Sequence, residues 1–255
     1  MTRRIDAPLG APVWIELSTS DMDASHSFYN ELLGWETEPS RAENHGYTNF
    51  LLHGERIAGS MIKPDQQPGP DTWLVYLASA DCAATVATAE TSGAQVIVPA
   101  MQVMELGSMA VLIAPDQSVV GVWQPEEHRG FGFIDEPGAP GWFELHTLDY
   151  DNALEFYRSV FGWSTDVMSD SPEFRYARMI EGDTLLAGVM DATPHMAPGF
   201  PSHWEIYFEV TEMDAASAKV LELGGQVLMP PHDSPFGRLG LFSDSTGALF
   251  KLMQR

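Results

Sequence analysis

Glu144 and His146 are the residues of this 255-residue chain whose types and spacing best suit chemistry. They lie two apart in a segment that alternates as a β-strand does, so both side chains point to one face. A carboxylate beside an imidazole suits proton transfer, provided that their surroundings separate the two pKa values. Glu205 and Lys251 lie in strand-like segments of their own, from which both could reach this pair across a sheet.

The segment that holds this pair is the second copy of a repeat. Residues 14–21, WIELSTSD, return 128 positions later at 142–149 as WFELHTLD. The pairs Phe-Tyr at 28–29 and Gly-Trp at 34–35 return at the same offset. A repeat of this length predicts two domains of like fold. Glu16 is thereby the counterpart of Glu144.

The repeat divides the chain into two domains, 11–124 and 142–254. A linker rich in Pro, Gly and charge joins them over 125–141. Each half divides again, because the order strand, helix, strand, strand, strand occurs twice within it. Asp21 is a suitable N-cap for the first helix, which we expect to end at Gly34. The fold class is therefore α+β, with four such units paired two and two.

Composition excludes several classes of function. The formal net charge of −23 argues against nucleic acid and against anionic membranes, since both demand a basic surface. No apolar run approaches the ~20 residues that cross a bilayer, and the N-terminus lacks the apolar core of a signal peptide. A single cysteine, Cys82, fits a reducing compartment, so we expect a cytoplasmic protein.

The four units resemble those of the vicinal oxygen chelate superfamily, which includes glyoxalase I, extradiol dioxygenases and bleomycin-resistance proteins. The paired pattern W-x-E-L-x-T-x-D, then FY, then GW is similar to that of two-domain glyoxalase-like proteins labelled hydroxylase or antigen in actinobacteria. The resemblance covers nearly the whole chain. It implies tandem domains in which βαβββ units pair into two curved mixed sheets, with a cleft inside each sheet and helices on the outer faces.

Strand alternation then assigns residues to the two clefts. We expect an apolar first cleft that contains Glu16 and a second cleft rich in ionisable groups. Trp14 and Trp142 either stack on an aromatic ligand or fill a narrow cleft, and Tyr76 and Tyr207 pack and donate hydrogen bonds. The candidate ligand-binding residues are Trp14, Glu16, Tyr76, Trp123, Trp142, Glu205, Tyr207 and, in a loop near the second cleft, Arg238.

The resemblance also raises the question of a divalent metal. In metal-using relatives the ligands come from the opening and closing strands of the units. Here the corresponding positions are Trp14 and Trp142 on the opening strands and Gly121 and Lys251 on the closing strands. Tryptophan and glycine offer no suitable side-chain ligand, and a protonated lysine repels a cation. We therefore expect no metal cofactor at the inherited positions.

Two further arrangements are open in the second half. Glu144, His146 and Glu205 could together hold a metal in a displaced site. Alternatively, Lys251 lies among these carboxylates and replaces the charge of the metal, which a buried carboxylate requires.

Three functions follow for a protein that binds a small organic molecule, as a monomer or a homodimer. The first is a metal-independent isomerase, lyase or hydroxylase-type enzyme with Glu144, His146 and Lys251 as catalytic residues. The second is a non-catalytic binder of a drug or metabolite. The third is a divalent-metal-dependent glyoxalase or dioxygenase.

Overall fold

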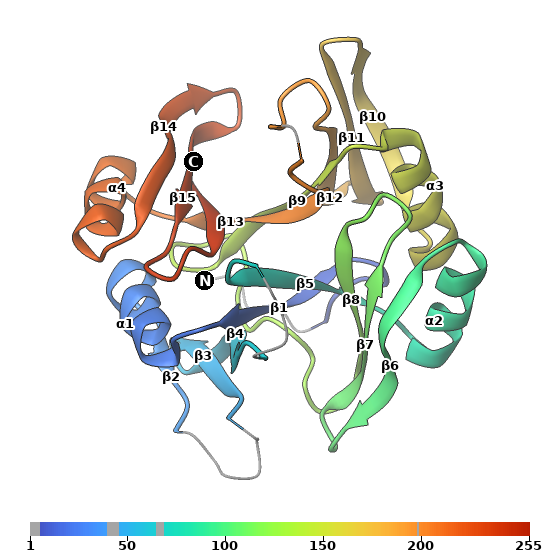
Figure 1. Ribbon diagram of the computed structural model, residues 1–255, viewed down its shortest axis with the longest axis horizontal. Coiled ribbons are helices and arrows are strands. Elements are labelled where there is room, and N and C mark those ends of the chain that lie inside the picture. Colours follow the sequence, from blue (N-terminus) through green and yellow to red (C-terminus); the bar gives the residue numbers. More distant parts are fainter. Residues whose placement is uncertain (1–5, 40–45, 65–68, 198) are drawn as a thin grey trace.

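The chain forms two eight-stranded mixed sheets and four helices, seen in a computed structural model (Figure 1). The structure describes residues 6–39, 46–64, 69–197 and 199–255. The first half contains β1 (Pro12–Thr19), α1 (Met22–Leu33), β2 (Glu36–Thr37), β3 (Thr48–Leu52), β4 (Glu55–Ile62), β5 (Thr72–Ala78), α2 (Cys82–Thr91), β6 (Gln95–Val103), β7 (Gly107–Ile113) and β8 (Val119–Pro125).

The second half repeats this order. It contains β9 (Pro140–Thr147), α3 (Tyr150–Phe161), β10 (Ser164–Ser171), β11 (Phe174–Glu181), β12 (Thr184–Asp191), β13 (His203–Glu209), α4 (Met213–Glu222), β14 (Gln226–Ser234), β15 (Gly237–Ser243) and β16 (Leu249–Gln254). The α+β architecture with paired units is thus confirmed.

Each sheet is built from one half of the chain. The strand orders are β2-β3-β4-β1-β5-β8-β7-β6 and β10-β11-β12-β9-β13-β16-β15-β14. The opening strands β1 and β5 pair antiparallel at the centre of the first sheet, as β9 and β13 do in the second. The two units of one domain therefore share a sheet, and units are not exchanged between the domains.

The caps of the first helix follow the sequence signals. The side chain of Asp21 accepts a hydrogen bond from the backbone N–H of Ala24 at 3.0 Å, which satisfies one free donor of the first turn. Gly34 ends the helix at φ 73°, a conformation that costs glycine little. Both predicted caps are confirmed.

No helix in the described part of the chain has the length and apolarity needed to span a membrane.

The two domains meet over the sheet faces that carry the helices. Phe208 and Phe250 alternate along their strands with Tyr207 and Lys251, and so face the opposite way, toward the first domain. The Phe208 ring lies 5.8 Å from that of Trp73 on β5. In Figure 1, α1 lies beside α4 and α2 beside α3, and both helix pairs form contacts. The faces predicted as outer are thus covered by the other domain.

The repeated Gly-Trp pairs fasten this interface reciprocally. Trp35 donates from Nε1 to the carbonyl of Gly138 at 2.6 Å, and Trp163 donates from Nε1 to the carbonyl of Gly10 at 2.9 Å. Each tryptophan is at most 4% exposed. Each bonds a glycine that lies just before the first strand of the other half, β9 or β1. The residues that recur at constant offset therefore hold the two domains together.

The repeated tyrosines complete the interface from within the core. Tyr29 donates its hydroxyl proton to Asp244 at 3.0 Å and accepts from Trp73 Nε1 at 3.0 Å. Tyr157 accepts from Trp204 Nε1 at 3.1 Å, and its hydroxyl lies 3.2 Å from that of Ser118. All of these groups are buried, so each hydroxyl links a tryptophan of its own domain to a polar side chain of the other.

We predict that Tyr29→Phe and Tyr157→Phe each lower the free energy of unfolding by about 1–3 kcal/mol, because each leaves a buried polar partner unpaired. Urea denaturation measures this effect. Tyr150→Phe is the matched control, because the buried Tyr150 hydroxyl has no hydrogen-bond partner among the described residues. A loss of stability in the control equal to that of the other two variants would contradict the prediction.

Candidate functional site

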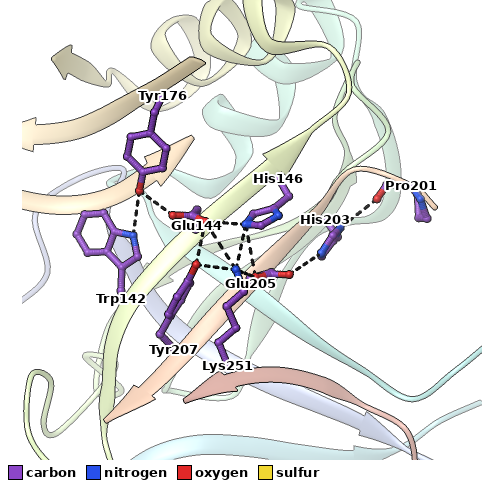
Figure 2. A network of polar contacts seen from close by, with 9 residues as sticks. All are labelled: Trp142, Glu144, His146, Tyr176, Pro201, His203, Glu205, Tyr207 and Lys251. Atoms are coloured by element: carbon purple, nitrogen blue, oxygen red, sulfur yellow. Dashed lines mark hydrogen bonds and ion pairs between the residues drawn. The ribbon is translucent and has the colours of Figure 1, made fainter. Parts of the chain in front are cut away.

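The second sheet brings the ionisable residues together at its centre (Figure 2). On β9 and β13, Glu144 lies directly opposite Glu205, and Trp142 opposite Tyr207. On β13 and β16, Tyr207 is the neighbour of Lys251. Because alternate side chains share a face, three strands present their polar residues to one place. We call Glu144, His146, Glu205, Tyr207 and Lys251 the second-domain cluster.

Glu144 is the most connected member of the cluster. Its Oε1 lies 2.6 Å from His146 Nε2 and accepts the hydroxyl proton of Tyr207 at 2.9 Å. Its Oε2 accepts the hydroxyl proton of Tyr176 at 2.7 Å. Trp142 in turn donates from Nε1 to the Tyr176 hydroxyl at 3.2 Å. Both carboxylate oxygens are therefore satisfied, and Glu144 holds the imidazole of His146 in a defined orientation.

Lys251 supplies a positive charge to the same place. Its Nζ donates to the Tyr207 hydroxyl at 2.7 Å and forms an ion pair with Oε2 of Glu205. It also lies 4.0 Å from Oε1 of Glu144 and 3.5 Å from Nε2 of His146. The ammonium thus lies among the carboxylates, as the interpretation of Lys251 as a substitute for a metal requires.

The cluster shifts the pKa of both glutamates downward. Burial alone would raise the pKa of Glu144, but the hydrogen bond and charge of His146, with the charge of Lys251, lower it to about 2. Burial opposes ionisation of Glu205 too, yet the charges of His146, Lys251 and His203 hold its pKa well below the usual range. At neutral pH both carboxylates are therefore ionised.

His203 stands at the edge of the cluster and was not singled out from the sequence. Its Nε2 lies 3.2 Å from Oε1 of Glu205, and its Nδ1 lies 3.0 Å from the carbonyl of Pro201. Both partners are acceptors, so both hydrogen bonds form only on a doubly protonated ring. His146, His203 and Glu205 also have ligand atoms within 4.8 Å of one another, close enough to share a metal ion. Two imidazoles and a carboxylate suit a divalent transition metal.

The first domain holds the same framework around Glu16. Trp14 donates from Nε1 to the Tyr47 hydroxyl at 3.0 Å, and Tyr76 donates to Oε1 of Glu16 at 3.4 Å. Burial raises the pKa of Glu16 to about 7, although hydrogen bonds from Tyr47 and Tyr76 lower it. The same carboxylate position is therefore half-protonated near neutral pH in one domain and fully ionised in the other.

Two tyrosines of these frameworks, Tyr47 and Tyr176, were missed by the sequence analysis. Each hydroxyl fills the space over a glycine on the neighbouring strand. A Cβ on Gly59 would lie 1.8 Å from the Tyr47 hydroxyl, and one on Gly188 would lie 1.9 Å from that of Tyr176. The signal was present, because Ala-Gly-x-Met recurs at 58–61 and 187–190. A glycine kept in both copies marks such a close approach.

The segment that joins the domains covers the aromatic end of the first cleft. The His128 ring packs edge-on against Trp14 at 4.3 Å, and its backbone carbonyl accepts a hydrogen bond from Trp123 Nε1 at 2.9 Å. Phe131 continues this cover and stacks on Phe143 of the second domain at 5.6 Å. Trp14 is 3% and Trp123 6% exposed. Both side chains therefore fill the cleft in this structure.

The remaining candidate residues fall into two groups. Trp142 and Tyr207 lie with the second-domain cluster, and Tyr76 lies with Glu16. Arg238 does not join them. It lies on strand β15 rather than in a loop, and its guanidinium pairs with Asp214 of α4 at 2.7 Å. The expectation of a loop was wrong because the turn signal Pro-Phe-Gly ends one residue before Arg238, where the strand already begins.

Comparison with family models matches both halves. Residues 139–252 match the model of the Glyoxalase/Bleomycin resistance protein/Dioxygenase superfamily. Residues 14–117 match a model described as a glyoxalase-like domain. The first of these matches spans the second sheet from β9 into β16, and the other spans the first sheet from β1 to β7 and ends before β8.

Named relatives share the full length of the chain. A Mycobacterium tuberculosis protein that bears the name of a glyoxylase, CFP32, is 35% identical over 259 residues, covering 100% of this chain and 98% of its own. The anthracycline biosynthesis protein DauV of a Streptomyces species is 33% identical over 261 residues, covering 96% and 93%.

Solved structures share the fold at low sequence identity. An Mn(II)-bound glyoxalase from Novosphingobium aromaticivorans superimposes with a TM-score of 0.65 at 15% identity, covering 96% of this chain and 82% of that one. A catechol 2,3-dioxygenase superimposes with a TM-score of 0.66 at 13% identity, covering 98% and 89%.

We predict that Lys251→Ala lowers the free energy of unfolding by about 3–5 kcal/mol at pH 7, because it leaves buried carboxylates without their cation. NMR titration should show a higher pKa for Glu205 in the variant. The difference in free energy of unfolding between the wild type and the variant should shrink as the pH falls from 4.5 toward about 2. Over this range Glu144 gains its proton in the folded protein. Unchanged stability, with no perturbed carboxylate, would refute this.

Lys219→Ala is the matched control for that experiment. Lys219 pairs with Glu31 at 3.2 Å and with Glu222 at 3.4 Å, but on the surface of α4. An exposed pair contributes about 0–1 kcal/mol, so this variant should unfold nearly as the wild type does.

We predict that Glu16→Gln raises the free energy of unfolding by an amount that depends on pH. Burial disfavours ionised Glu16, so the wild type loses stability as the pH rises from 4.5 through about 7. Glutamine stays neutral, and the variant should become the more stable protein above pH 7, by up to about 3 kcal/mol. Denaturation at pH 5 and pH 8 measures the difference. A gain that is the same at both pH values would speak against a buried, titrating Glu16.

Proposed function

The chain belongs to the Glyoxalase/Bleomycin resistance protein/Dioxygenase superfamily, and from this we propose that its second-domain cluster is an acid–base site for a small organic substrate. The reaction class is proton transfer at a carbon beside a carbonyl, as in an isomerisation or a lyase reaction. One observation carries the proposal: Lys251 holds the closing-strand position, and its ammonium contacts Glu205 and Tyr207.

His146 is the base in this proposal. Its Nε2 is held by Glu144 at 2.6 Å, which fixes that nitrogen as the donor and leaves the lone pair on Nδ1. No hydrogen bond reaches Nδ1 from the residues that the structure describes. A carboxylate that orients an imidazole also stabilises the imidazolium formed when the ring takes a proton. Glu144 is thus a positioning residue, and His146 carries the proton.

Lys251, which donates to the Tyr207 hydroxyl, is suited to the other half of the reaction. Removal of a proton beside a carbonyl places negative charge on the carbonyl oxygen. A fixed ammonium, aligned before the reaction, stabilises such charge more than water does. The ammonium and the hydroxyl lie 2.7 Å apart, and their residues are 8% and 4% exposed, which keeps the local dielectric low. His146 together with the Lys251 ammonium lowers the pKa of both glutamates, so neither competes as an acid.

The inherited metal positions do not suit a metal in this chain. Their residues are Trp14, Trp142, Gly121 and Lys251, none of which is a usual ligand. An ammonium at the last position also neutralises Glu205, the carboxylate that a metal would need. In the proposed acid–base site the Lys251 ammonium therefore supplies the positive charge that a metal would otherwise supply.

One observation favours a second candidate, a metal-dependent enzyme. His146, His203 and Glu205 present two imidazoles and a carboxylate within reach of a single ion. A divalent metal held there would supply Lewis acidity to a bound oxygen. The Lys251 ammonium would have to turn away from Glu205, because it would otherwise repel the positive charge of the metal. This candidate shares His146 and Glu205 with the first, so the two are separated by metal content.

The names of the relatives support a small organic ligand. One bears the name of a glyoxylase and another that of an anthracycline biosynthesis protein. Trp142 is partly exposed beside the second-domain cluster and offers an aromatic surface. We propose an apolar or aromatic substrate on these grounds. A protein that only binds such a molecule would use the same surface without the proton transfer.

We predict that the protein, purified without added metal or chelator, carries less than stoichiometric divalent metal by elemental analysis. In D₂O it should exchange the carbon-bound protons of hydroxyacetone or 2-hydroxyacetophenone, followed by ¹H NMR. His146→Gln should slow the exchange by about 10²–10⁴-fold, the range for loss of a general base. His195→Gln, a change in a turn outside the sheet, is the control.

Other outcomes assign the other functions. A stoichiometric metal whose removal abolishes exchange identifies the metal-dependent enzyme. Calorimetric binding of the ketones without exchange, equal in the wild type and in His146→Gln, identifies a binder. Either result rejects the acid–base proposal.

A further inference from the structure

The first domain repeats the framework of the second but not its charges. Tyr76 and Tyr47 hold Glu16 as Tyr207 and Tyr176 hold Glu144. The neighbours differ. Glu16 lies opposite Leu74, where Glu144 lies opposite Glu205. The first domain therefore contains a carboxylate in the same cradle but in different electrostatic surroundings.

The missing charges can be traced position by position. Tyr76 has Gly121 as its neighbour on β8, where Tyr207 has Lys251 on β16. The residue two beyond Glu16 is Ser18, where the residue two beyond Glu144 is His146. In the described part of the chain no Lys, Arg or His forms an ion pair with Glu16. The cation that the second domain supplies from its own strand is thus lacking in the first.

The sheet face beside Glu16 carries partly exposed side chains. Glu16, Ser18 and Leu74 are each partly exposed, and Val119, two residues before Gly121, is 41% exposed. The Ser18 Oγ is buried without a hydrogen-bond partner among the described residues. The cover formed by His128 and Phe131 packs over Trp14, at the other end of the cleft. A ligand can therefore approach the partly exposed Glu16 over the apolar surface of Leu74 and Val119.

We propose that this cleft is a second small-molecule site, which binds a primary organic ammonium ion with its charge on Glu16 and its apolar body against Leu74 and Val119. An ionised carboxylate in such surroundings is stabilised by a paired cation. Lys251 shows where an ammonium is favoured in this cradle, between the tyrosine hydroxyl and the carboxylates. In the first domain the ligand brings that ammonium.

The shape of the cleft sets the direction of approach. A Cβ on Gly121 would lie 2.2 Å from a ring carbon of Tyr76, so the Tyr76 ring fills the path that the lysine stem takes in the second domain. The ammonium must instead enter past Leu74 and Ser18. An unbranched or benzylic amine fits this approach better than a bulky tertiary one.

The site predicts its own pH dependence. Only ionised Glu16 attracts a cation, and burial raises the pKa of that carboxyl to about 7. The surrounding groups do not titrate near this value. The pKa values of Tyr47 and Tyr76 lie well above their usual range, and that of His128, against Trp14, is lowered to about 4. Arg56 and Glu38 are the other charged groups nearby. A change in affinity between pH 5 and pH 8 therefore reports on Glu16.

Isothermal titration of the full chain with benzylammonium tests the proposal. We expect saturable binding at pH 8 that weakens by about tenfold for each pH unit below 7, as protons compete for the carboxylate. Glu16→Gln keeps the shape and removes the charge, so it should lower the affinity by roughly 10- to 100-fold. Glu90→Gln, the same change at an exposed position of α2, should bind as the wild type does.

Three results would overturn the proposal. Binding of benzyl alcohol or benzoate as tight as that of benzylammonium would assign the cleft to neutral or acidic ligands. Full affinity in Glu16→Gln would place the binding elsewhere, and no saturable binding of the amine at pH 8 would remove the site. If Glu16→Gln fails to fold, the pH series on the wild type decides alone. None of these results bears on the second-domain cluster, which is tested by metal content and proton exchange.

Discussion

A carboxylate near the centre of each sheet is the constraint on which this structure depends. Glu16 and Glu144 occupy the middle of the opening strands, where neighbouring strands remove water from both sides. A buried charge is costly unless it is hydrogen-bonded and paired. In both domains two tyrosines hydrogen-bond the carboxylate, and a tryptophan donates a hydrogen bond to one of them. Only the second domain also provides ion-pair partners for its carboxylate, Lys251 and His146.

That difference separates the chemistry of the two halves. The second domain keeps its carboxylates ionised and orients an imidazole. In the first domain burial raises the pKa of Glu16 to about 7. One framework thus supports two electrostatic states, because three neighbouring positions differ. The interface between the domains does not involve these three positions, since it uses the opposite face of each sheet.

Much of the fold could be predicted from the sequence. Asp21 and Gly34 bounded the first helix because capping is a local requirement. Alternation placed Glu144 and His146 on one face because a strand has a period of two. The roles of Tyr47, Tyr176 and His203 depend on strands and loops that return from elsewhere in the chain. Arg238 was placed in a loop because the preceding turn signal was extended one residue too far.

The sequence by itself determined the duplication, the α+β class, the superfamily resemblance and the residues that alternate toward each cleft. These follow from local periodicity and from the constant offset of the two copies. Only the tertiary structure decided that Lys251 contacts Glu205, that the joining segment covers Trp14, and that each Gly-Trp pair binds the opposite domain. The reason is physical: such contacts depend on strand register and on the packing of two domains, and neither is encoded within one segment.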